Sequence, residues 1–412
     1  MQPTIALLDL DAFFASVEVA LDPTLKGKPV IVCRVDPQGG KAFRGIVSAA
    51  SYEARKFGIH SGMPTYQAVK LAPKAIYVDG NYHRYSEFSK KVFRIAARYC
   101  PHIEVVSVDE GFLDFTDCQR LYPNLPAICE RIRAEVKKEV GITASIGLAT
   151  SRVVAKVAAD FGKPDGLTVV PDGDEKKFLS PLPIRDLPGI GRQTEKKLLS
   201  MGIERVGQIA NLSEELVTKT LGKFGHNLWL SSNGVSNIRF DPHDLQKGVS
   251  RSRTFSQNSN DSHFLKSMLH FLVEKVVGDM RSKSFRGSLI HTVIRDKHFN
   301  SVGRQRKIGF FTDHAKDIYS VAEELFFELW DRTTPLRLIG VGVSFFETYS
   351  PTQLSLFEGE DEKSKAVDKA VDRLRDKYGF FAVQPAQVLS ISKEYNSYNK
   401  EQTFFTTFDI NH

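Results

Sequence analysis

The stretch IEVVSVDEGFLDF (103–115) places two adjacent carboxylates, Asp109 and Glu110, in the middle of an otherwise apolar segment. Its apolar residues fall into two short runs, so we expect two β-strands with the acids near their junction. A second apolar run, TIALLD (4–9), ends in a third acid, Asp9. Uninterrupted apolar runs are typical of strands buried on both faces of a sheet. Together the two stretches predict a buried sheet that carries three acids.

Carboxylates in apolar surroundings are unfavourable unless they are paired with a cation or bound to a metal. Mg²⁺ prefers a few carboxylates together with substrate phosphates. Two ions roughly 3.5–4 Å apart can clamp the attacking and leaving oxygens of a phosphoryl displacement. The other interpretation is that the three acids are solvated at strand ends. The apolar flanks of Asp109–Glu110 and of Asp9 favour a metal centre.

Strands and helices alternate around these stretches. Helical spacing predicts helices over 11–22, 84–100 and 126–140, and ITASIGLAT (142–150) predicts another strand. Residues 28–80 form a small mixed segment with the strand PVIVC and the helix SYEARKFGI. Strands interleaved with helices around one sheet predict an α+β or mixed α/β layer.

The second half of the chain changes in composition. The motif PLPIRDLPGIGRQTEKKLLSMGIERVGQIANL predicts a helix, a tight turn and a helix, with Gly189 and Gly191 placed for the turn. Residues 249–347 predict strand, helix, strand, strand, helix, strand, which is a compact α+β domain with helices on one face of its sheet. The tail, 348–412, holds the apolar peptide QLSLF and then a mixed-charge helix over 358–378.

The positive charge is concentrated in one segment. The whole chain carries +7, whereas residues 245–310 alone contain 13 Lys/Arg against 4 Asp/Glu, an excess of nine. Such a segment points to a phosphate backbone as partner, although a solvated basic face is the simpler alternative. A length of 412 residues predicts two to four domains, and no apolar run is long enough to cross a bilayer.

Cysteine usage and the first residues bear on the compartment. The start MQPTIALLDLDAFF has acids inside its apolar stretch and no basic leader, so it predicts a buried strand rather than a signal peptide. The four cysteines show no CxxC spacing, which indicates unpaired thiols in a reduced cytoplasm; they are Cys33, Cys100, Cys118 and Cys129.

Four motifs, in this order, resemble the Y-family DNA polymerases, most closely the DinB or DNA polymerase IV branch. They are DLDAFFASVE (9–18), SAASYEARKFGIHSGMP (48–64), SVDEGFLD (107–114) and AADFGKPDGL (158–167), and the resemblance covers about residues 1–350. It implies an α+β right-hand polymerase of several domains. These are a palm (1–13 and 81–170), small fingers (14–80), a helical thumb with a helix-hairpin-helix (171–240), a DNA-binding little finger (245–347) and the tail (348–412).

The resemblance gives the acids a role. It implies that Asp9, Asp109 and Glu110, with the backbone carbonyl of Leu10, hold two Mg²⁺ ions for transfer of a nucleotide to a primer 3′ end. Phe14 matches an aromatic steric gate that collides with a ribose 2′-hydroxyl. Helix spacing alone leaves Phe14 equally compatible with an ordinary core position.

Three residues match the family's contacts to the incoming deoxynucleoside triphosphate. Tyr52 and Arg55 lie one turn apart on SYEARKFG, so they share a helix face. Arg suits forked contact with phosphate oxygens, and Lys163 in the GKPDG turn adds a point charge. Apart from the resemblance, a solvated surface position is the simpler interpretation of these residues. Ala49 departs from the family, because many relatives carry a hydroxyl there, which puts one hydrogen bond in doubt.

Several segments predict contact with primer-template DNA. The LPGIG turn resembles a helix-hairpin-helix that offers backbone N–H groups to a phosphate, although a plain αα-hairpin remains open. Basic residues alternate at strand period in SRSRTFS and GRQRKIG, which places several of them on one face. The predicted DNA-binding residues are Gly189, Gly191, Arg251, Arg253, Arg304 and Arg306.

The peptide QLSLF in the tail resembles the short motif with which bacterial polymerases dock on the sliding clamp. A Gln followed by spaced apolar anchors suits insertion into a pocket. The predicted clamp-binding residues are Gln353, Leu354, Leu356 and Phe357. About 55 residues follow the peptide, and the sequence assigns them no role.

The sequence thus predicts a low-fidelity, template-directed DNA polymerase for translesion synthesis, without proofreading, that acts as a monomer in the cytoplasm. No segment has the length and second acidic cluster of a proofreading exonuclease. Two alternatives remain: a DNA-binding accessory protein with a vestigial polymerase core, and a palm-type nucleotide cyclase. A cyclase has no use for a helix-hairpin-helix or a strongly basic domain.

Overall fold

The computed structural model describes residues 3–34, 45–236, 246–347, 359–389 and 391. The chain divides into two compact units, one of residues 1–243 with 401–412 and the other of residues 244–400. We describe each unit by itself.

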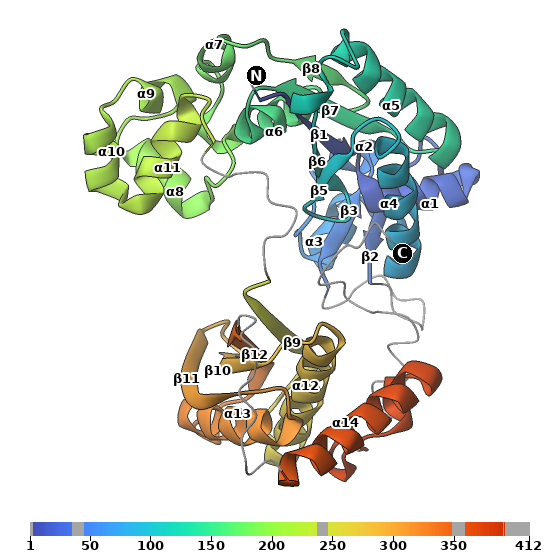
Figure 1. Ribbon diagram of the computed structural model, residues 1–412, viewed down its shortest axis with the longest axis vertical. Helices are drawn as coiled ribbons and strands as arrows, with labels where there is room; N and C mark the ends of the chain where they lie inside the picture. Colours follow the sequence, from blue (N-terminus) through green and yellow to red (C-terminus); the bar gives the residue numbers. More distant parts are fainter. Residues whose placement is uncertain (1–2, 35–44, 237–245, 348–358, 390, 392–412) are drawn as a thin grey trace. The chain divides into compact units, whose positions relative to one another are not determined.

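A five-stranded sheet forms the centre of the first unit (Figure 1). Its strand order is β5 (His102–Val105), β6 (Glu110–Asp114), β1 (Ile5–Leu10), β7 (Ala144–Ala149) and β8 (Leu167–Val169). The central strand β1 pairs antiparallel with both β6 and β7, and β8 runs parallel to β7. The expected strand pair over 103–115 is therefore confirmed, with Asp109 and Glu110 at its junction.

Helices cover both faces of this sheet (Figure 1). Alternate residues of β1 enter two cores: Leu8 packs toward α1 (Phe13–Leu21), α4 (Tyr82–Ala96) and α5 (Leu125–Val140), whereas Leu7 packs toward α6 (Arg152–Phe161). The helix α6 lies very close to the sheet, because a Cβ on Gly147 of β7 would stand 2.1 Å from the carbonyl oxygen of Ala155. A short 3₁₀ turn, η2 (Thr116–Cys118), follows β6.

A smaller three-stranded sheet holds the mixed segment expected over 28–80. Its order is β3 (Val47–Ala50), β2 (Val30–Cys33) and β4 (Ile76–Val78), accompanied by η1 (Pro23–Leu25), α2 (Tyr52–Arg55) and α3 (Thr65–Leu71). The buried residues Ile31, Val47 and Ala54 belong to a core of their own. This sheet therefore forms a separate packing layer that carries α2.

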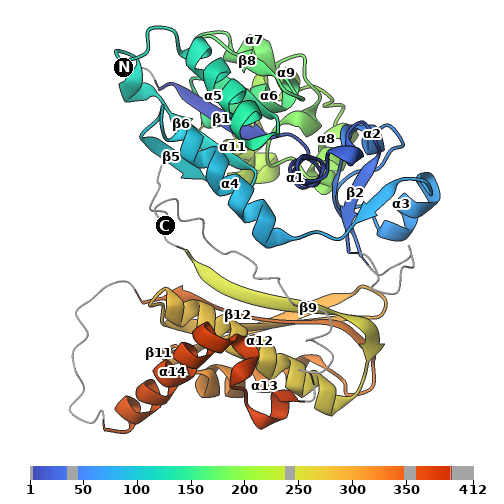
Figure 2. The same cartoon turned by 90° about the vertical axis from the view of Figure 1, so that its right-hand side faces the viewer.

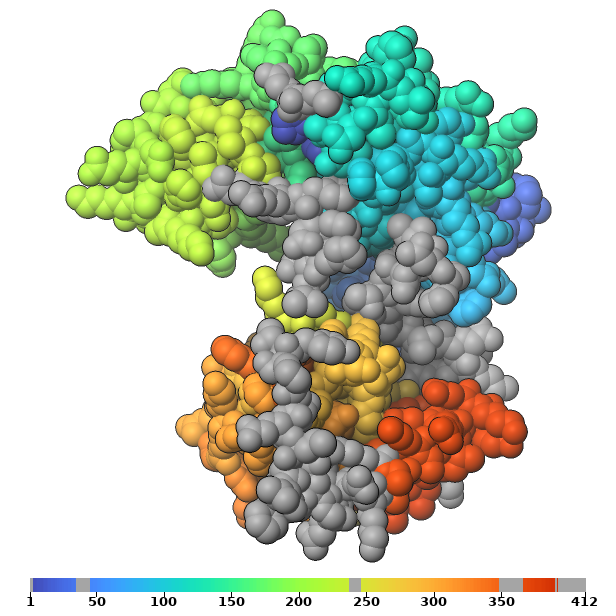
Figure 3. Space-filling view, in the orientation of Figure 1, coloured from blue at the N-terminus to red at the C-terminus, as the bar shows by residue number. Residues whose placement is uncertain are grey.

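Residues 175–232 form a helical lobe, which stands out in the space-filling view (Figure 3). It consists of α7 (Glu175–Leu179), η3 (Ile184–Asp186), α8 (Arg192–Ser200), α9 (Val206–Ala210), α10 (Glu214–Leu221) and α11 (Lys223–Ser232). The expected first helix of the hairpin is only the 3₁₀ turn η3, because prolines at 181, 183 and 188 lack the N–H groups that an α-helix needs. The tight turn is where the sequence predicts it: Gly189 has φ +92° and Gly191 is the N-cap of α8.

The second unit has the predicted strand and helix order. A four-stranded antiparallel sheet in the order β11 (Ser301–Thr312), β10 (Gly287–Asp296), β12 (Leu336–Phe346) and β9 (Gly248–Ser259) packs against α12 (Ser262–Ser282) and α13 (Ala315–Leu329). Figure 2 shows the helices of this unit on one side of the sheet. Ile290, Ile339 and Val343 point into the core beneath those helices.

The second unit continues beyond the boundary that the sequence predicts at residue 347. The mixed-charge helix is α14 (Gly359–Tyr378), followed by two 3₁₀ turns, η4 (Phe380–Ala382) and η5 (Ala386–Val388). Val388 and Ile391 are each 1% exposed and join the same core as α12 and α13. Residues 359–389 and 391 are therefore a third layer of this unit rather than a separate tail.

All four cysteines are free and buried within the first unit. Burial raises the pKa of the Cys33 thiol to about 11 and those of Cys100 and Cys129 to about 12, and it also raises the pKa of Cys118. Within the part of the chain that the structure describes, no helix is both long and apolar enough to span a bilayer.

Candidate active site

Backbone pairing places two of the three acids side by side. Asp9, near the end of β1, lies directly opposite Glu110, the first residue of β6. Directly opposed residues of an antiparallel pair share one face of the sheet. The shared face is the one covered by α6, because Leu7 and Phe112 on the same strand faces belong to the core beneath that helix.

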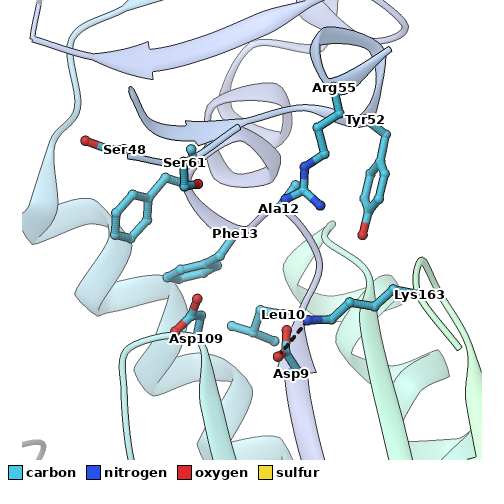
Figure 4. A pocket seen from close by; sticks show the side chains of 12 residues that line it. Asp9, Leu10, Ala12, Phe13, Ser48, Tyr52, Arg55, Ser61, Asp109 and Lys163 are labelled. Carbon is cyan, nitrogen blue, oxygen red and sulfur yellow. Dashed lines mark ion pairs between the residues drawn. The ribbon is translucent and has the colours of Figure 1, made fainter. Parts of the chain in front are cut away.

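Asp9 is a buried carboxylate held by a lysine. Its Oδ2 lies 2.8 Å from Nζ of Lys163 (Figure 4), and the residue is 8% exposed. Burial raises the pKa of Asp9 to about 6, although the positive charge of Lys163 works in the opposite direction. Lys163 also contacts Asp160 at 2.7 Å, and these two carboxylates raise the pKa of Lys163 against the effect of burial. The site therefore combines a buried acid of raised pKa with a cation held next to it.

Asp109 reaches the same pocket from the turn before β6. The N–H of Leu10 donates to the Asp109 carbonyl oxygen at 2.8 Å, which ties that turn to the end of β1. The hydroxyl of Ser107 donates to the Asp109 carboxylate. Asp9 and Asp109 both line a pocket of about 150 Å³.

Glu110 differs from the other two acids, because its carboxylate is paired with Lys156 of α6 and it is absent from the lining of the pocket. Among the described residues, no set of three or more His, Cys, Asp or Glu side chains stands gathered as metal ligands. The donor types nevertheless fit a divalent cation, since carboxylates and a backbone carbonyl are the oxygens that Mg²⁺ takes. The register brings Asp9 and Glu110 to the same end of the sheet.

The opposite wall of the pocket comes from α2 of the small sheet. Tyr52, Arg55 and Lys163 line the pocket with the acids (Figure 4). The Arg55 guanidinium lies 4.7 Å from the centre of the Tyr52 ring, and its Nε donates to the Ala50 carbonyl at 3.1 Å. The Tyr52 hydroxyl is buried and has no hydrogen-bond partner among the described residues. A buried hydroxyl without a partner is unfavourable, so this one indicates a ligand that supplies an acceptor.

Phe14 occupies the third side of the pocket. Its ring stacks on Tyr85 of α4, with ring centres 4.2 Å apart and an interplanar angle of 12°, and it meets Tyr82 edge-on at 6.0 Å. The neighbouring Phe13, which is 4% exposed, also lines the pocket and belongs to the sheet core. Phe14 is only partly buried, so one side of its ring remains open to the pocket.

The small sheet adds polar residues that the sequence motifs did not single out. Ser48 and Ser61 line the pocket beside Ala49, the position where a hydroxyl is expected from the family. Ser48, one residue before Ala49, is exposed and does not replace the hydroxyl missing at Ala49, because successive residues of a strand point to opposite faces. Alternation along β3 predicts that Ser48 points away from the buried side chains of its neighbours.

Asp11 is a buried carboxylate that sequence reasoning missed. It is 1% exposed and accepts hydrogen bonds from the Ser145 hydroxyl and the Asp165 N–H, each at 2.8 Å. The only signal in the sequence is that an acid stands two residues after Asp9. Its partners lie 134 and 154 residues away, so no local pattern could identify them.

The basic residues predicted to contact DNA in the second unit all lie on the helix-covered face of the sheet. By register, Arg251 is opposite Val341 and Arg306 is opposite Ile290, and both of these partners are buried beneath the helices. Arg253 is likewise opposite Ile339, and Arg304 is opposite Thr292. The four arginines therefore share one face, as the alternation in the sequence predicts.

Three of these arginines form ion pairs with the helices. Arg251 pairs with Asp279 of α12. Arg304 lies 2.8 Å from Glu328 of α13, and Arg306 lies 2.6 Å from the same carboxylate and also pairs with Glu324. Their DNA contacts stay a prediction. The clamp-binding peptide, Gln353 to Phe357, lies outside the described residues.

Family models match most of the chain. The impB/mucB/samB family matches residues 8–160, the family's C-terminal domain matches 246–356, and its helix-hairpin-helix motif matches 172–203. With this fold and pocket, the chain belongs to the Y family of translesion DNA polymerases, in the branch that includes DNA polymerase IV.

Individual relatives agree with this assignment. The chain is 38% identical over 380 residues to DNA polymerase IV of Dehalococcoides mccartyi strain CBDB1, covering 92% of this chain and 95% of that protein. It is 34% identical to DNA polymerase IV of Desulfatibacillum aliphaticivorans, covering 94% and 98%.

Solved structures agree as well. A chimera of the Y-family polymerases Dbh and Dpo4 matches with a TM-score of 0.74 and 28% identity, over 84% of this chain and all of that one. An insertion ternary complex of Dbh DNA polymerase matches with a TM-score of 0.60, 28% identity and the same coverage. This chain is therefore a DNA-directed DNA polymerase of the translesion type, and the vestigial and cyclase alternatives are set aside. Y-family polymerases use divalent metal ions.

Proposed function

We propose that the chain adds deoxynucleotides to a primer 3′ end at the pocket built by Asp9, Asp109 and Lys163, with Tyr52 and Arg55 opposite. The observation that carries this proposal is the gathering of acids and phosphate-binding cations around one pocket, next to a buried Tyr52 hydroxyl without a partner. The substrates are primer-template DNA and deoxynucleoside triphosphates.

Each side chain has a separate role in this proposal. Asp9, Asp109, Glu110 and the Leu10 carbonyl hold two Mg²⁺ ions. When bound, these ions neutralise phosphate charge and lower the pKa of the primer 3′-hydroxyl. Tyr52 donates its hydroxyl to a phosphate oxygen, which removes the unsatisfied group. Arg55 and Lys163 bind and orient the triphosphate from two sides of the pocket.

Phe14 is proposed to select the sugar. Its ring is fixed from behind by the stack on Tyr85, so it cannot retreat when a larger sugar arrives. A ribose 2′-hydroxyl beside this ring would overlap with it, whereas a deoxyribose would not. Discrimination by overlap with a rigid wall needs no hydrogen bond.

We propose the following domain limits. The palm is 1–13 with 81–170, the fingers are 14–80, the thumb is 171–240 and the little finger begins at 245. Two observations support these limits: the small sheet has its own core, and α7–α11 form their own lobe. The helix α1, by contrast, lies in one core with palm residues and with Val32 and Ala49 of the small sheet, so the palm–fingers limit passes through a shared core.

The DNA-binding surfaces are proposed from charge and turn geometry. Gly189 and Gly191 shape a turn at the N-terminus of α8 that suits a phosphate. The basic strands of the second unit supply Arg251, Arg253, Arg304 and Arg306, and QLSLF docks on the sliding clamp. We further propose a monomer that works in the cytoplasm on nucleoid DNA with low fidelity and without proofreading.

Primer extension with Mg²⁺ and deoxynucleotides, on undamaged and lesion-bearing templates, tests the site. Asp109→Ala should abolish extension and leave primer-template binding unchanged, because it removes a pocket carboxylate without touching a basic surface. Asp117→Ala, which removes an exposed acid outside the pocket, is the matched control and should extend normally. Retained turnover by the Asp109 variant would refute the metal-binding role.

A further inference from the structure

The proposed mechanism leaves one buried acid near the site without a role. Asp11 follows Asp9 by two residues, at the end of β1, and its carboxylate is enclosed. Oδ1 accepts from the Ser145 hydroxyl and Oδ2 accepts from the Asp165 N–H, both at 2.8 Å. A buried carboxylate needs such donors on both oxygens to be tolerated. Asp11 therefore joins the end of β1 to two distant parts of the chain.

The turn that Asp11 contacts is the one that carries Lys163. It joins α6 to β8 through residues 162–166 and is tight, because a Cβ on Gly166 would stand 1.9 Å from the Gly162 carbonyl oxygen. Asp165 has φ +51°, a left-handed backbone that residues with side chains rarely adopt. Such a conformation persists only when its surroundings fix it.

The turn is fixed at Asp165 from two sides. On the outside, the Asp165 carboxylate lies 2.9 Å from Arg133 and 2.6 Å from Lys137, both on α5. On the inside, its N–H donates to Asp11. The Ser145 hydroxyl, which donates to Asp11, also receives the N–H of Gly166 at 3.4 Å. Of these contacts, the hydrogen bond from the Asp165 N–H to Asp11 attaches the turn to the residue that directly follows the strand of Asp9.

The contacts close a ring through the active site. Lys163 reaches Asp9 at 2.8 Å. One residue of the turn, Pro164, separates Lys163 from Asp165, and the Asp165 N–H returns to Asp11, which directly follows the strand of Asp9. We propose that Asp11 is a positioning residue that sets the Lys163 ammonium for the triphosphate by holding the Asp165 backbone. This inference rests on the proposed contact of Lys163 with the incoming nucleotide.

Loss of Asp11 should act on nucleotide binding more than on chemistry. Asp11→Ala removes both acceptors, so the Asp165 backbone loses its hydrogen bond to the end of β1 and only the ion pair with Asp9 still holds Lys163 there. We expect the KM for the incoming nucleotide to rise roughly tenfold, since a displacement of about 1 Å at a positioning group has effects of this size or larger. The kcat and the affinity for primer-template DNA should change by less than about threefold.

A conservative variant separates positioning from simple loss of a buried charge. In Asp11→Asn, the amide oxygen can accept from Asp165 N–H while the amide nitrogen donates to the Ser145 oxygen, because a hydroxyl can rotate to accept. Asp11→Asn should therefore restore the KM to near the wild-type value. Ser145→Ala, which leaves the Asp165 contact intact, should stay within about twofold. If the KM of Asp11→Asn is raised as much as that of Asp11→Ala, the proposal is wrong.

A double-mutant cycle with Lys163→Ala decides whether Asp11 acts through the lysine. If it does, Asp11→Ala adds little to the KM already raised by Lys163→Ala. If the KM of the double variant rises by the product of the two single increases, Asp11 does not act through Lys163, although the nucleotide contact of Lys163 stands. If Lys163→Ala leaves the KM unchanged, the proposed nucleotide contact itself is wrong. Thermal unfolding shows whether Asp11→Ala folds. If it does not, Asp11→Ser takes its place in the cycle, and the same KM comparisons apply.

Discussion

At the scale of single residues, Phe14 shows how much of a site depends on what stands behind it. Tyr85, 2% exposed, backs the Phe14 ring and donates its hydroxyl to Glu18 at 2.6 Å. Burial and this hydrogen bond raise the pKa of Tyr85, so the phenol stays neutral and the bond persists. The ring of Phe14 is thus a fixed wall rather than a mobile side chain.

Phe14→Ala should admit ribonucleotides, because the wall that overlaps a 2′-hydroxyl is removed. We expect the ratio of kcat/KM for deoxynucleotides over ribonucleotides to fall by at least roughly tenfold. Phe115→Leu, a change of volume in the same core but outside the pocket, is the control and should keep the ratio. Single-nucleotide insertion kinetics measure both, and an unchanged ratio for Phe14→Ala would remove the gate assignment.

The raised pKa of Asp9 gives the metal requirement a pH dependence. Burial places this pKa at about 6, above the usual value for an aspartate. Below pH 6 the folded protein holds Asp9 mainly protonated, and a proton must leave before a cation binds. The apparent affinity for Mg²⁺ in primer extension should therefore weaken as pH falls from 7 to 5, by up to about tenfold per pH unit below 6.

The control is DNA binding without metal, which should change far less over the same range. A Mg²⁺ affinity that is constant between pH 5 and pH 7 would mean that protonation of Asp9 does not control metal binding.

The sequence predicted the acids but not their partners. Asp9, Asp109 and Glu110 stand in or beside apolar runs, and an uninterrupted apolar run is a local signal. The pairings Asp9–Lys163 and Glu110–Lys156 join residues far apart in the chain and depend on how α6 crosses the sheet. Chain-distant contacts of this kind have no local signature, which is also why Asp11 was missed.

At the scale of elements, α14 docks on α12 through charged side chains. Arg375, 8% exposed, lies 2.8 Å from Glu274, and Arg281 lies 2.6 Å from Asp372. Arg375 also donates to the Val383 carbonyl at 3.0 Å. Apolar side chains, including Val388, then close the layer beside these pairs.

Arg375→Ala should destabilise the second unit by about 3 kcal/mol, because it leaves Glu274 buried without its cation. Urea unfolding followed by the fluorescence of Trp330 measures this. A Trp229→Phe background suits the experiment, because the chain has two tryptophans and only Trp330 then remains.

The matched double variant is Glu274→Leu with Arg375→Met, which replaces the pair by apolar groups of similar size. Most of the lost stability should return, since the buried charge that Arg375→Ala leaves behind is gone. Equal stability of Arg375→Ala and the wild type would mean that α14 does not rest on this pair.

The sequence predicted α14 as a helix but not as part of a core. Its mixed charges are typical of a solvated helix. Only the three-dimensional structure shows that some of them pair with opposite charges on α12. The sequence of α12 did indicate a further covering layer, because this helix is apolar on more than one side. Leu269 and Phe271, which lie on different sides of it, are both buried in this core. A helix apolar on two sides requires two covering layers.

At the scale of the whole molecule, the net positive charge makes the affinity for DNA depend on salt. Each phosphate contact should contribute about one unit to the slope of log affinity against log salt. Arg304→Gln with Arg306→Gln should therefore reduce the slope by about two units if both arginines contact phosphates. Anisotropy of a labelled primer-template over a salt series measures the slope.

Glu324→Gln with Glu328→Gln is the informative counterpart, because it releases the same arginines from their ion pairs. Tighter DNA binding by this variant is expected. If the arginine variant keeps the slope of the wild type and the glutamate variant does not bind DNA more tightly, Arg304 and Arg306 do not contact DNA.

The enclosed cysteines have a consequence for an enzyme that copies damaged templates. Reactive thiols attack and are attacked as thiolates, and burial keeps all four of these thiols neutral and out of reach. Oxidants and alkylating agents that modify DNA bases thus meet no exposed cysteine on this protein. Modification of a thiol is therefore not a route by which the agents that damage its templates would inactivate the polymerase.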